Sequence, residues 1–303
     1  MPIQSGYIEK IIKGFASKQL SLIEEMSQSI IAEYKNEMEN SWLNDEMKGI
    51  FLTRLNNLEL KIINIRYEQA LTYEVSDNFV VGMIGLVNLV SFARTNIRFK
   101  VAKYRRRLML KERYIGPAKR KSGQHLVPFI NYNVADNRLE VPLAELLTLP
   151  LFNPQLPMSW NYAYFGVAIS RELSKLHLKV YSHFGRYSEP LFTKKNCFKR
   201  LRNHSMFNFD DLIDTCIGLK IAYKAFKREL HANPNGNHSI HRLSYATPKQ
   251  QFFIAYSAIY CEETKPYEIQ VSVANSGSFA RAFNCEINSP MNPMEKCDFW
   301  DKM

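Results

Sequence analysis

Glycine and proline are scarce in this sequence, with 12 and 13 residues of these types in a chain of 303. The sequence also has no low-complexity tract and no internal repeat. Because 46% of the residues are hydrophobic and 13% are aromatic, the chain has enough apolar material to bury a substantial core. This composition excludes disorder as the main state and allows one large domain or two ordinary ones.

Long hydrophobic runs are missing as well. No segment reaches the roughly 18 uninterrupted apolar residues that a membrane-spanning helix needs. The strongest candidate, residues 79–93, contains Asn88 and lies between Asp77 and Arg94, so we predict a buried helix there. The first ten residues lack the apolar core of a signal peptide. We therefore expect neither a transmembrane segment nor a secretory signal within this chain.

The formal net charge of +11 makes a nucleic-acid or membrane-surface partner worth considering. The positive charge is spread along the chain, with one dense patch at residues 100–121. No zinc knuckle, RNA-binding signature or basic strand with interleaved aromatic residues accompanies this patch. We interpret it as the solvated face of a helix followed by a loop, and we predict no nucleic-acid partner.

The histidines do not follow the spacing of a zinc site. His238 and His241 form H-x-x-H in a loop near His231, where no rigid element fixes their spacing. His177 and His183 are six residues apart and do not share one helical face. We interpret all five as ordinary loop or surface histidines.

The five cysteines all fall in the last third of the chain, and their spacing fits no C-x-x-C zinc module. Asn-x-Ser sequons occur at Asn203 and Asn237, which favours secretion weakly because such triplets often arise by chance. This weak indication conflicts with the missing signal peptide.

Hydrophobic periodicity predicts a mainly α-helical fold with a small β-sheet, an α+β arrangement. Helices are predicted over much of the first 66 residues, including Met47 to Ile65 after a cap at Asn44 or Asp45, and over residues 161–180, 210–230 and 250–261. Residues 126–141 are predicted to form two extended runs around a polar turn at Asp136 and Asn137.

Six stretches, in order along nearly the whole chain, match the sequence pattern of one family. They are YIEK, WLNDEMK and LNNLELKI near the start, NRLEVP (137–142), WNYAYFGVAISREL (160–173), IGLKIAYKAF (217–226), QQFFIAYSAIYC (250–261) and AFNCEINSPMNPMEKCDFW (282–300). One such match would mean little, but six in the right order are specific. The chain resembles the neprilysin family of zinc metallopeptidases.

The resemblance implies a thermolysin-like zincin catalytic domain that is truncated at its N-terminus, because family members are much longer. Residues 1–66 resemble the end of the family's N-terminal peptidase region, and residues 67–303 resemble the C-terminal catalytic domain. It also implies that the protein is secreted or lies at the cell surface.

The resemblance further implies a disulfide between Cys197 and Cys297. The family partners of Cys261 and Cys285 lie far upstream, so these two cysteines are left free or pair with each other. Cys216 has no family counterpart, and we interpret it as a buried thiol.

The family's zinc chemistry depends on two motifs. In H-E-x-x-H two histidines one helical turn apart bind zinc and the Glu is the general base, while the Glu of E-N-x-x-D is the third ligand and its Asp orients a ligating His. Here Arg171 and Lys175 replace both histidines, and Glu172 alone matches the general base. Asp211 stands where the third ligand should be, and Thr215 replaces the orienting Asp.

These replacements predict that no zinc cofactor is bound. Arginine and lysine stay protonated and offer no lone pair to a metal ion. Zinc lowers the pKa of bound water from about 15.7 to about 7, which Glu172 alone does not achieve. We therefore interpret Glu172 as a retained but non-functional position. Our hypothesis is that Arg171 and Lys175 fill the place of the metal and pair with Asp211 and Glu172.

The substrate-binding positions of the family are also altered. Pro128, Phe129 and Ile130 lie where the family's N-A-Y edge strand holds the substrate backbone, and proline donates no hydrogen bond. Glu268 lies near the place of a substrate-clamping arginine. We predict a catalytically inactive homologue, a pseudopeptidase, that binds a peptide or protein partner. The alternatives are a zinc metalloendopeptidase with residual activity and a structural remnant with no binding role.

Overall fold

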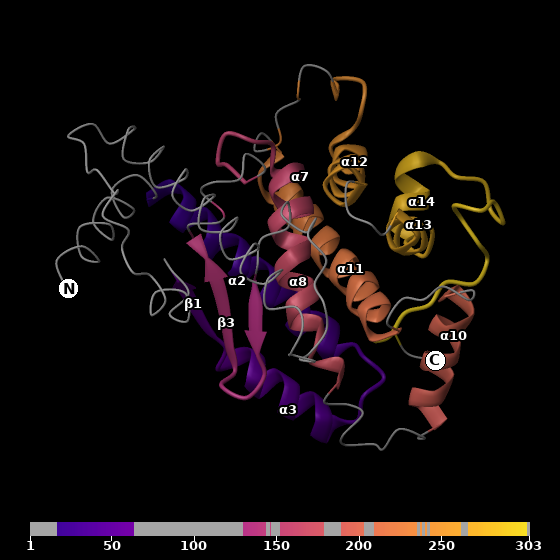
Figure 1. The fold of residues 1–303 in the computed structure, drawn as a ribbon, viewed down its shortest axis with the longest axis horizontal. Coiled ribbons are helices and arrows are strands. Elements are labelled where there is room, and N and C mark those ends of the chain that lie inside the picture. Colours follow the sequence, from indigo (N-terminus) through magenta and orange to yellow (C-terminus); the bar gives the residue numbers. More distant parts are fainter. Residues whose placement is uncertain are drawn as a thin grey trace, which may run out of the picture. The chain divides into compact units, whose positions relative to one another are not determined.

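The computed structural model describes residues 17–63, 130–143, 146, 152–178, 189–202, 209–234, 237, 240, 243–261 and 266–301. All of them belong to one compact unit, which comprises Met1–Asn64 and Gly123–Met303. Several predicted features lie outside the described residues: the domain boundary after residue 66, the helix at 79–93, the basic patch at 100–121, Pro128 and Phe129. The mainly helical fold with a small sheet is confirmed (Figure 1).

The N-terminal part forms two helices, α2 (Ser17–Glu39) and α3 (Asp45–Asn56). The side chain of Asn44 accepts a hydrogen bond from the backbone N–H of Met47 at 3.0 Å, so the predicted N-cap is confirmed. Asp45 and Glu46 follow in the first turn, where negative charge stabilises the helix dipole.

The helix predicted from Met47 to Ile65 is wrong beyond Asn56. Residues Glu59–Ile63 form strand β1 instead, which pairs in parallel with β3 (Arg138–Pro142). A run this short fits helical and extended patterns alike, so strand pairing, which is a tertiary interaction, decides between them.

The three described strands lie in the order β1-β3-β2, with β2 (Asn131–Asn133) antiparallel to β3. The turn between β2 and β3 contains Asn137 at φ 52°, a left-handed conformation that asparagine tolerates. Its side-chain amide donates to the backbone carbonyls of Arg54 and Asn57 at 2.8 and 2.9 Å. This contact ties the predicted hairpin to the end of α3.

The helix predicted over residues 161–180 is present in three pieces. A short α7 (Met158–Asn161) leads into a π-helical segment η1 (Tyr162–Gly166), and α8 (Val167–Ser174) follows. Phe165, Ile169 and Leu173 are fully buried, as their spacing predicts. Single π-helical turns within helices often lie near functional sites.

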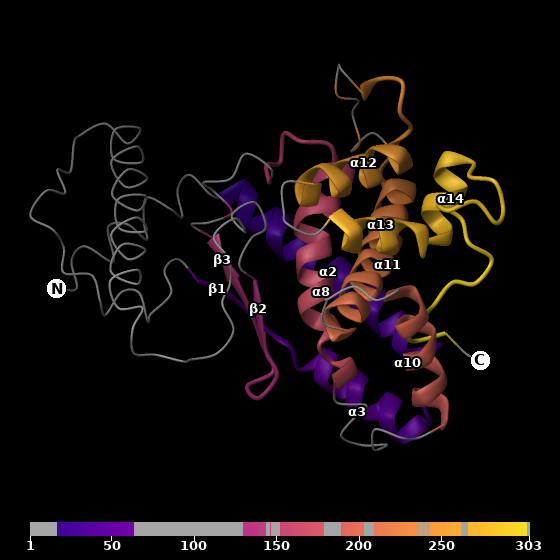
Figure 2. The same cartoon turned by 45° about the vertical axis from the view of Figure 1, so that its right-hand side comes forward.

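The remaining helices are α10 (Glu189–Arg202), α11 (Phe209–Ala232), α12 (Pro248–Cys261), α13 (Pro266–Ala274) and α14 (Gly277–Phe283). The helices predicted at 210–230 and 250–261 are thereby confirmed. Figures 1 and 2 show α8 and α11 side by side, and α11 also contacts α2, α10 and α13. The long helix α11 is therefore the central element of the described fold.

Opposite charges join α2 to α11 in matching helical register. Arg228 pairs with Glu33 at 3.4 Å, and Lys224 pairs with Glu37 at 2.6 Å. Lys220, one turn earlier on α11, also pairs with Glu37. Because both helices present these charges four residues apart, the pairs set the lengthwise alignment of the two helices.

The C-terminal segment is part of the core. Phe299 and Trp300 are fully buried. Their backbone carbonyls accept hydrogen bonds from Trp42, from its indole N–H at 2.7 Å and its backbone N–H at 3.1 Å. The last described residues thus stabilise the turn between α2 and α3.

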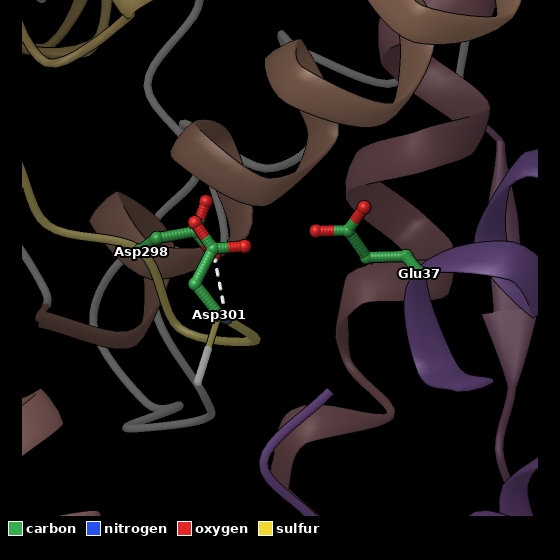
Figure 3. A group of neighbouring side chains, drawn as sticks. All are labelled: Glu37, Asp298 and Asp301. Atoms are coloured by element: carbon green, nitrogen blue, oxygen red, sulfur yellow. Dashed lines mark hydrogen bonds between the residues drawn. The ribbon is translucent and has the colours of Figure 1, made fainter. Parts of the chain in front are cut away.

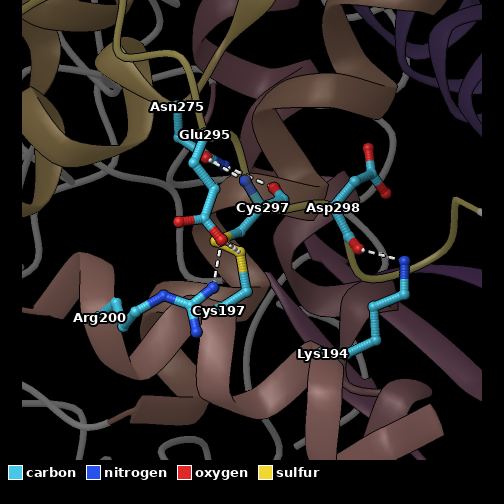
Figure 4. Close-up of a disulfide and its surroundings, with 7 residues drawn as sticks. All are labelled: Lys194, Cys197, Arg200, Asn275, Glu295, Cys297 and Asp298. Atoms are coloured by element: carbon cyan, nitrogen blue, oxygen red, sulfur yellow. Dashed lines mark hydrogen bonds and ion pairs between the residues drawn. A yellow bond between two sulfur atoms is a disulfide. The ribbon is translucent and has the colours of Figure 1, made fainter. Parts of the chain in front are cut away.

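A disulfide holds the same segment against α10 (Figure 4). It joins Cys197 and Cys297, the pairing that the family resemblance implies. Asn275 exchanges two hydrogen bonds with the backbone of Cys297, both at 2.7 Å, and Lys194 donates to the carbonyl of Asp298 at 2.9 Å. A link across 100 residues of sequence restricts the unfolded chain strongly.

Gly218 permits the closest approach of α11 to α8. A Cβ at this position would lie 2.6 Å from Cγ and 2.8 Å from the backbone N of Arg171. We expect Gly218→Ala to lower the free energy of unfolding by about 1–3 kcal/mol, because the helices must separate. Urea denaturation followed by circular dichroism measures this change.

Gly49 on the exposed side of α3 supplies the control, since a Cβ there would meet nothing within 4 Å. Gly49→Ala should leave stability unchanged or raise it by about 0.5–1 kcal/mol. Equal effects of the two substitutions would show that the contact with Arg171 is unimportant.

Candidate functional site

The predicted site residues gather where α8 and α11 face each other. Helix α11 carries Asp211 and Thr215, which lie one helical turn apart, and helix α13 carries Glu268. The members with described side chains are Arg171, Glu172, Lys175, Asp211, Thr215 and Glu268. The altered edge-strand positions Pro128 and Phe129 lie outside the described residues.

The carboxylate of Glu172 is held from two directions. Its Oε2 lies 2.5 Å from the ammonium nitrogen of Lys175 and accepts the backbone N–H of Tyr132 at 3.0 Å. The predicted pairing of Glu172 with Lys175 is confirmed. A general base uses a carboxylate oxygen to take a proton from water. In Glu172 this oxygen already accepts hydrogen bonds from Lys175 and Tyr132.

The contact with Tyr132 also affects the edge of the sheet. Tyr132 lies in β2, which ends the described strand order, and its N–H points away from β3 towards Glu172. Ile130, which we placed at the altered edge-strand position, immediately precedes this strand and is 5% exposed. The backbone N–H of Tyr132 therefore donates to a side chain of the same protein and is not available to pair with a bound peptide strand.

Arg171 lies against a carboxylate that our hypothesis did not name. Its Nη2 is 3.4 Å from Oε1 of Glu268, and the hydroxyl of Thr215 donates to the same oxygen at 2.6 Å. The side chain of Glu268 is 7% exposed, so this buried charge needs both partners. Glu268, Thr215 and Arg171, three positions that the family resemblance predicts to be altered, thus contact one another.

These side chains do not fit a zinc ion. Such an ion needs several neutral nitrogen, thiolate or carboxylate donors converging on one point. Here the two histidine positions carry Arg171 and Lys175, whose protonated nitrogens lack lone pairs. Each of these cations lies beside a carboxylate, Glu268 and Glu172 respectively. An ion placed between the helices would meet two positive charges in place of two ligands.

His177 is a functional candidate that the sequence reasoning missed. We expected a loop or surface histidine, and this is wrong because the side chain is fully buried. Its Nδ1 lies 2.8 Å from the carbonyl of Ser174 and 3.0 Å from Oδ1 of Asp214. Its Nε2 lies 3.6 Å from Oδ1 of Asp210. The sequence signal that could have indicated a buried partner was the spacing of Asp210 and Asp214, four residues apart at the start of α11.

One group of three carboxylates in the described part of the chain lies close enough to hold a metal ion. It comprises Glu37, Asp298 and Asp301, whose oxygens lie within 4.8 Å of one another (Figure 3). The ammonium of Lys220 pairs with all three. Burial is the largest influence and lowers the pKa of Lys220, but Asp298 and Glu37 together raise it above its usual value. A lysine side chain thus supplies the cation there.

Other residues singled out in the sequence have no place in this site. Cys216 and Cys285 are free thiols. The side-chain oxygen of Asn237, within one of the two sequons, accepts the backbone N–H of Ser159 at 2.7 Å. Asn203 in the other sequon lies outside the described residues. No helix in the described ranges is long and apolar enough to cross a membrane.

Comparisons with known proteins place the site helices within one family. The model of peptidase family M13 matches residues 170–299. Endothelin-converting enzyme-like 1 of Mus musculus is 30% identical over 200 residues, which cover 54% of this chain and 25% of that protein. Neprilysin-1 of Caenorhabditis elegans is 23% identical over 344 residues, which cover 98% of this chain and 43% of that protein. The chain thus spans less than half the length of these relatives.

A solved structure, the Haemonchus galactose containing glycoprotein complex, has a similar fold. It aligns with a TM-score of 0.61 and 16% identity, covering 94% of this chain and 50% of the other. At this identity the likeness concerns the fold alone, and it agrees with the mainly helical domain with a small sheet described above.

The hydroxyl of Thr215 is predicted to stabilise the buried carboxylate of Glu268. Thr215→Val keeps the side-chain shape but removes the donor at 2.6 Å, so the free energy of unfolding should fall by about 1–3 kcal/mol. Thr215→Ser restores a hydroxyl and should recover at least half of this loss in the same urea titration. Equal losses in both variants would contradict a role for the hydrogen bond.

Lys220 is predicted to hold three acidic side chains together. Lys220→Met leaves Glu37, Asp298 and Asp301 without this cation, and we expect a loss of roughly 3 kcal/mol, since 24% of the lysine side chain is exposed. Thermal and urea unfolding at neutral pH measure the loss. Lys227→Met on the exposed side of the same helix is the control and should change stability by under about 0.5 kcal/mol. Similar losses would contradict the network.

Proposed function

Because the chain belongs to the neprilysin family, peptidase family M13, and carries part of its catalytic domain, we propose that it is a non-catalytic member that binds a peptide or protein partner. The observation that carries the proposal is the ion pairing at the degenerate metal motif. Lys175 holds Glu172 at 2.5 Å, and Arg171 lies 3.4 Å from Glu268. Both cations of this centre thus lie beside a carboxylate, without a metal ion.

The chemistry of the family supports this proposal. Peptide hydrolysis in the family needs a metal ion that activates water and polarises the carbonyl group. A carboxylate without that ion supplies neither effect, and Glu172 is already bound by Lys175 and by the backbone of Tyr132. We therefore propose that Glu172 retains the position of the general base but not its role.

The preserved scaffold supports a binding role over a structural remnant. The core is continuous from α2 to the C-terminal segment, and Phe299 and Trp300 are fully buried within it. An intact core keeps the surface folded, and we propose that this surface serves binding. The partner would be a peptide or protein, and we propose no nucleic-acid partner.

The disulfide is relevant to the cellular location of the protein. The bond between Cys197 and Cys297 is of the kind that persists in oxidising surroundings. Together with the family membership, it supports an extracellular or cell-surface location for the protein. We keep the proposed division into residues 1–66 and a peptidase-like domain of residues 67–303 as part of the same proposal.

The competing function is a zinc metalloendopeptidase with residual activity. The observation that favours it is the retained carboxylate pair of the two motifs, Glu172 and Asp211, on the facing helices α8 and α11. This function requires that a metal ion displace Lys175 from Glu172 and tolerate Arg171 beside it.

Metal content and peptide cleavage decide between the two functions. We expect the purified protein, loaded with excess zinc and then dialysed, to keep far less than one equivalent by plasma mass spectrometry. We also expect no cleavage of a broad peptide library above that of the Glu172→Gln variant. That variant serves as the control for contaminating peptidases, after its unfolding curve has shown that it is folded.

Stoichiometric zinc, together with cleavage that disappears in Glu172→Gln, would restore the enzyme. Affinity capture from the native source then separates a binder from a remnant. A binder should retain a partner in fixed stoichiometry, and Lys175→Glu, which faces the site, should weaken capture while Lys199→Glu on exposed α10 should not.

A further inference from the structure

A buried histidine connects α8 to α11 beside the candidate site. His177 follows the end of α8, while Asp210 and Asp214 lie in the first two turns of α11. The imidazole is fully buried, and both of its nitrogens face oxygen atoms. His177 and Asp210 lie outside the two family motifs, and Asp214 stands at a variable position of the second one.

The neighbouring atoms determine the protonation state of the ring. Nδ1 lies within 3.0 Å of a carbonyl oxygen of Ser174 and a carboxylate oxygen of Asp214. Nε2 lies 3.6 Å from a carboxylate oxygen of Asp210. A carbonyl and an ionised carboxylate only accept hydrogen bonds, and a neutral imidazole has a single N–H. Only the doubly protonated ring offers an N–H on each side.

We propose that His177 is a positioning residue, protonated at neutral pH, that joins α8 to α11 by ion pairs with Asp214 and Asp210. It keeps the altered metal-motif helix in register with the helix that carries Thr215, as a shared metal ion would. The inference rests on the geometry of His177 and not on the proposed loss of activity.

The charges around this pair come from two helices. From α11, Asp210 and Asp214 face the ring. From α8, the positive charges of Arg171 and Lys175 act on Asp214 and stabilise its ionised form. The ion pair therefore lies in a set of alternating charges that continues into the candidate site.

Helix α2 and the C-terminal segment enclose the pair. The fully buried side chain of Tyr34 on α2 lies close enough to Asp214 to interact with it electrostatically. The ring of Phe299 meets the imidazole edge to face, with centroids 5.3 Å apart. Because these neighbours exclude water, the ion pair is stronger than an exposed one would be, and the loss of either partner is more costly.

The pKa values agree with the geometry. Burial is the largest influence and lowers the pKa of His177, but the neighbouring carboxylates of Asp210 and Asp214 outweigh it and raise the pKa to about 9. Burial raises the pKa of Asp214, and His177 opposes that shift. The folded-state pKa of His177 thus lies above the unfolded value of about 6.5.

This shift fixes the sign of the pH dependence. A group whose pKa is raised by folding contributes its full stabilisation below the unfolded pKa and loses it as pH rises through the folded pKa. The contribution of His177 should therefore be complete below about pH 6.5 and should fade as pH approaches and passes about 9. The imidazole therefore keeps its charge at neutral pH.

Nuclear magnetic resonance on the unmodified protein tests the charge directly. With the imidazole Cε1 labelled with carbon-13, the His177 signal should show the imidazolium at pH 7 and should titrate with a midpoint more than one unit above 6.5. Comparison with the spectrum of a His177→Gln variant assigns the signal. A His177 ring that is neutral at pH 7 would overturn the inference without any requirement that a variant fold.

Stability measurements test the cross-link. His177→Phe should lower the folding equilibrium constant at least about tenfold at pH 6.5, one pKa unit being a factor of ten, and the loss should shrink towards pH 10. His231→Phe at the exposed end of α11 is the control and should change neither quantity. A pH-independent loss in His177→Phe would mean that the ring acts by packing alone.

A double-mutant cycle identifies the partner. Asp214→Leu combined with His177→Phe should lose less than the sum of the two single losses, because each single variant leaves one buried charge unpaired. Strictly additive losses would overturn the pairing. Zinc binding in the test of the proposed function leaves these outcomes unaffected, so the two proposals can fail separately.

Discussion

The contact of α8 with α11 at Gly218 is the constraint on which the candidate site depends. The missing side chain of Gly218 lets the backbone of α11 approach Arg171 so closely that a single methyl group would overlap it. At this separation Thr215 shares Glu268 with Arg171. A wider crossing would leave Glu268 buried without its hydrogen bond, a state that proteins avoid. The close packing of α8 against α11 therefore also determines which charged and polar groups of the site can meet.

A common principle links the charged groups of the structure: buried or half-buried carboxylates are neutralised by side chains of the same chain. Lys220 does so among three carboxylates of α2 and the C-terminal segment, Lys175 does so for Glu172, and His177 does so for Asp214. An internal cation is always present at full occupancy, so a fold built this way does not depend on metal supply, whereas a metal-bound fold does. The proposed change from peptidase to binding protein follows the same logic at the former metal position.

Elements with a local signal or a dense family pattern could be predicted from the sequence. The cap at Asn44 and the helices that became α11 and α12 follow from short-range chemistry and from repeating apolar positions. The pairing of Cys197 with Cys297 came from the family resemblance. Strand β1 could not be predicted, because its apolar run of five residues is compatible with either structure until its strand partner is known.

Composition and motif order by themselves determined a mainly helical, core-forming chain of the neprilysin family with Arg171 and Lys175 in place of histidines. Only the tertiary structure decided which acids those cations meet, because Glu268 is 97 residues from Arg171 in sequence and no periodicity connects them. It also decided that His177 is buried between aspartates of another helix. Residue types and short spacings are properties of the chain, whereas charge partners and burial depend on which helices pack together, and long-range contacts arise only when the chain folds.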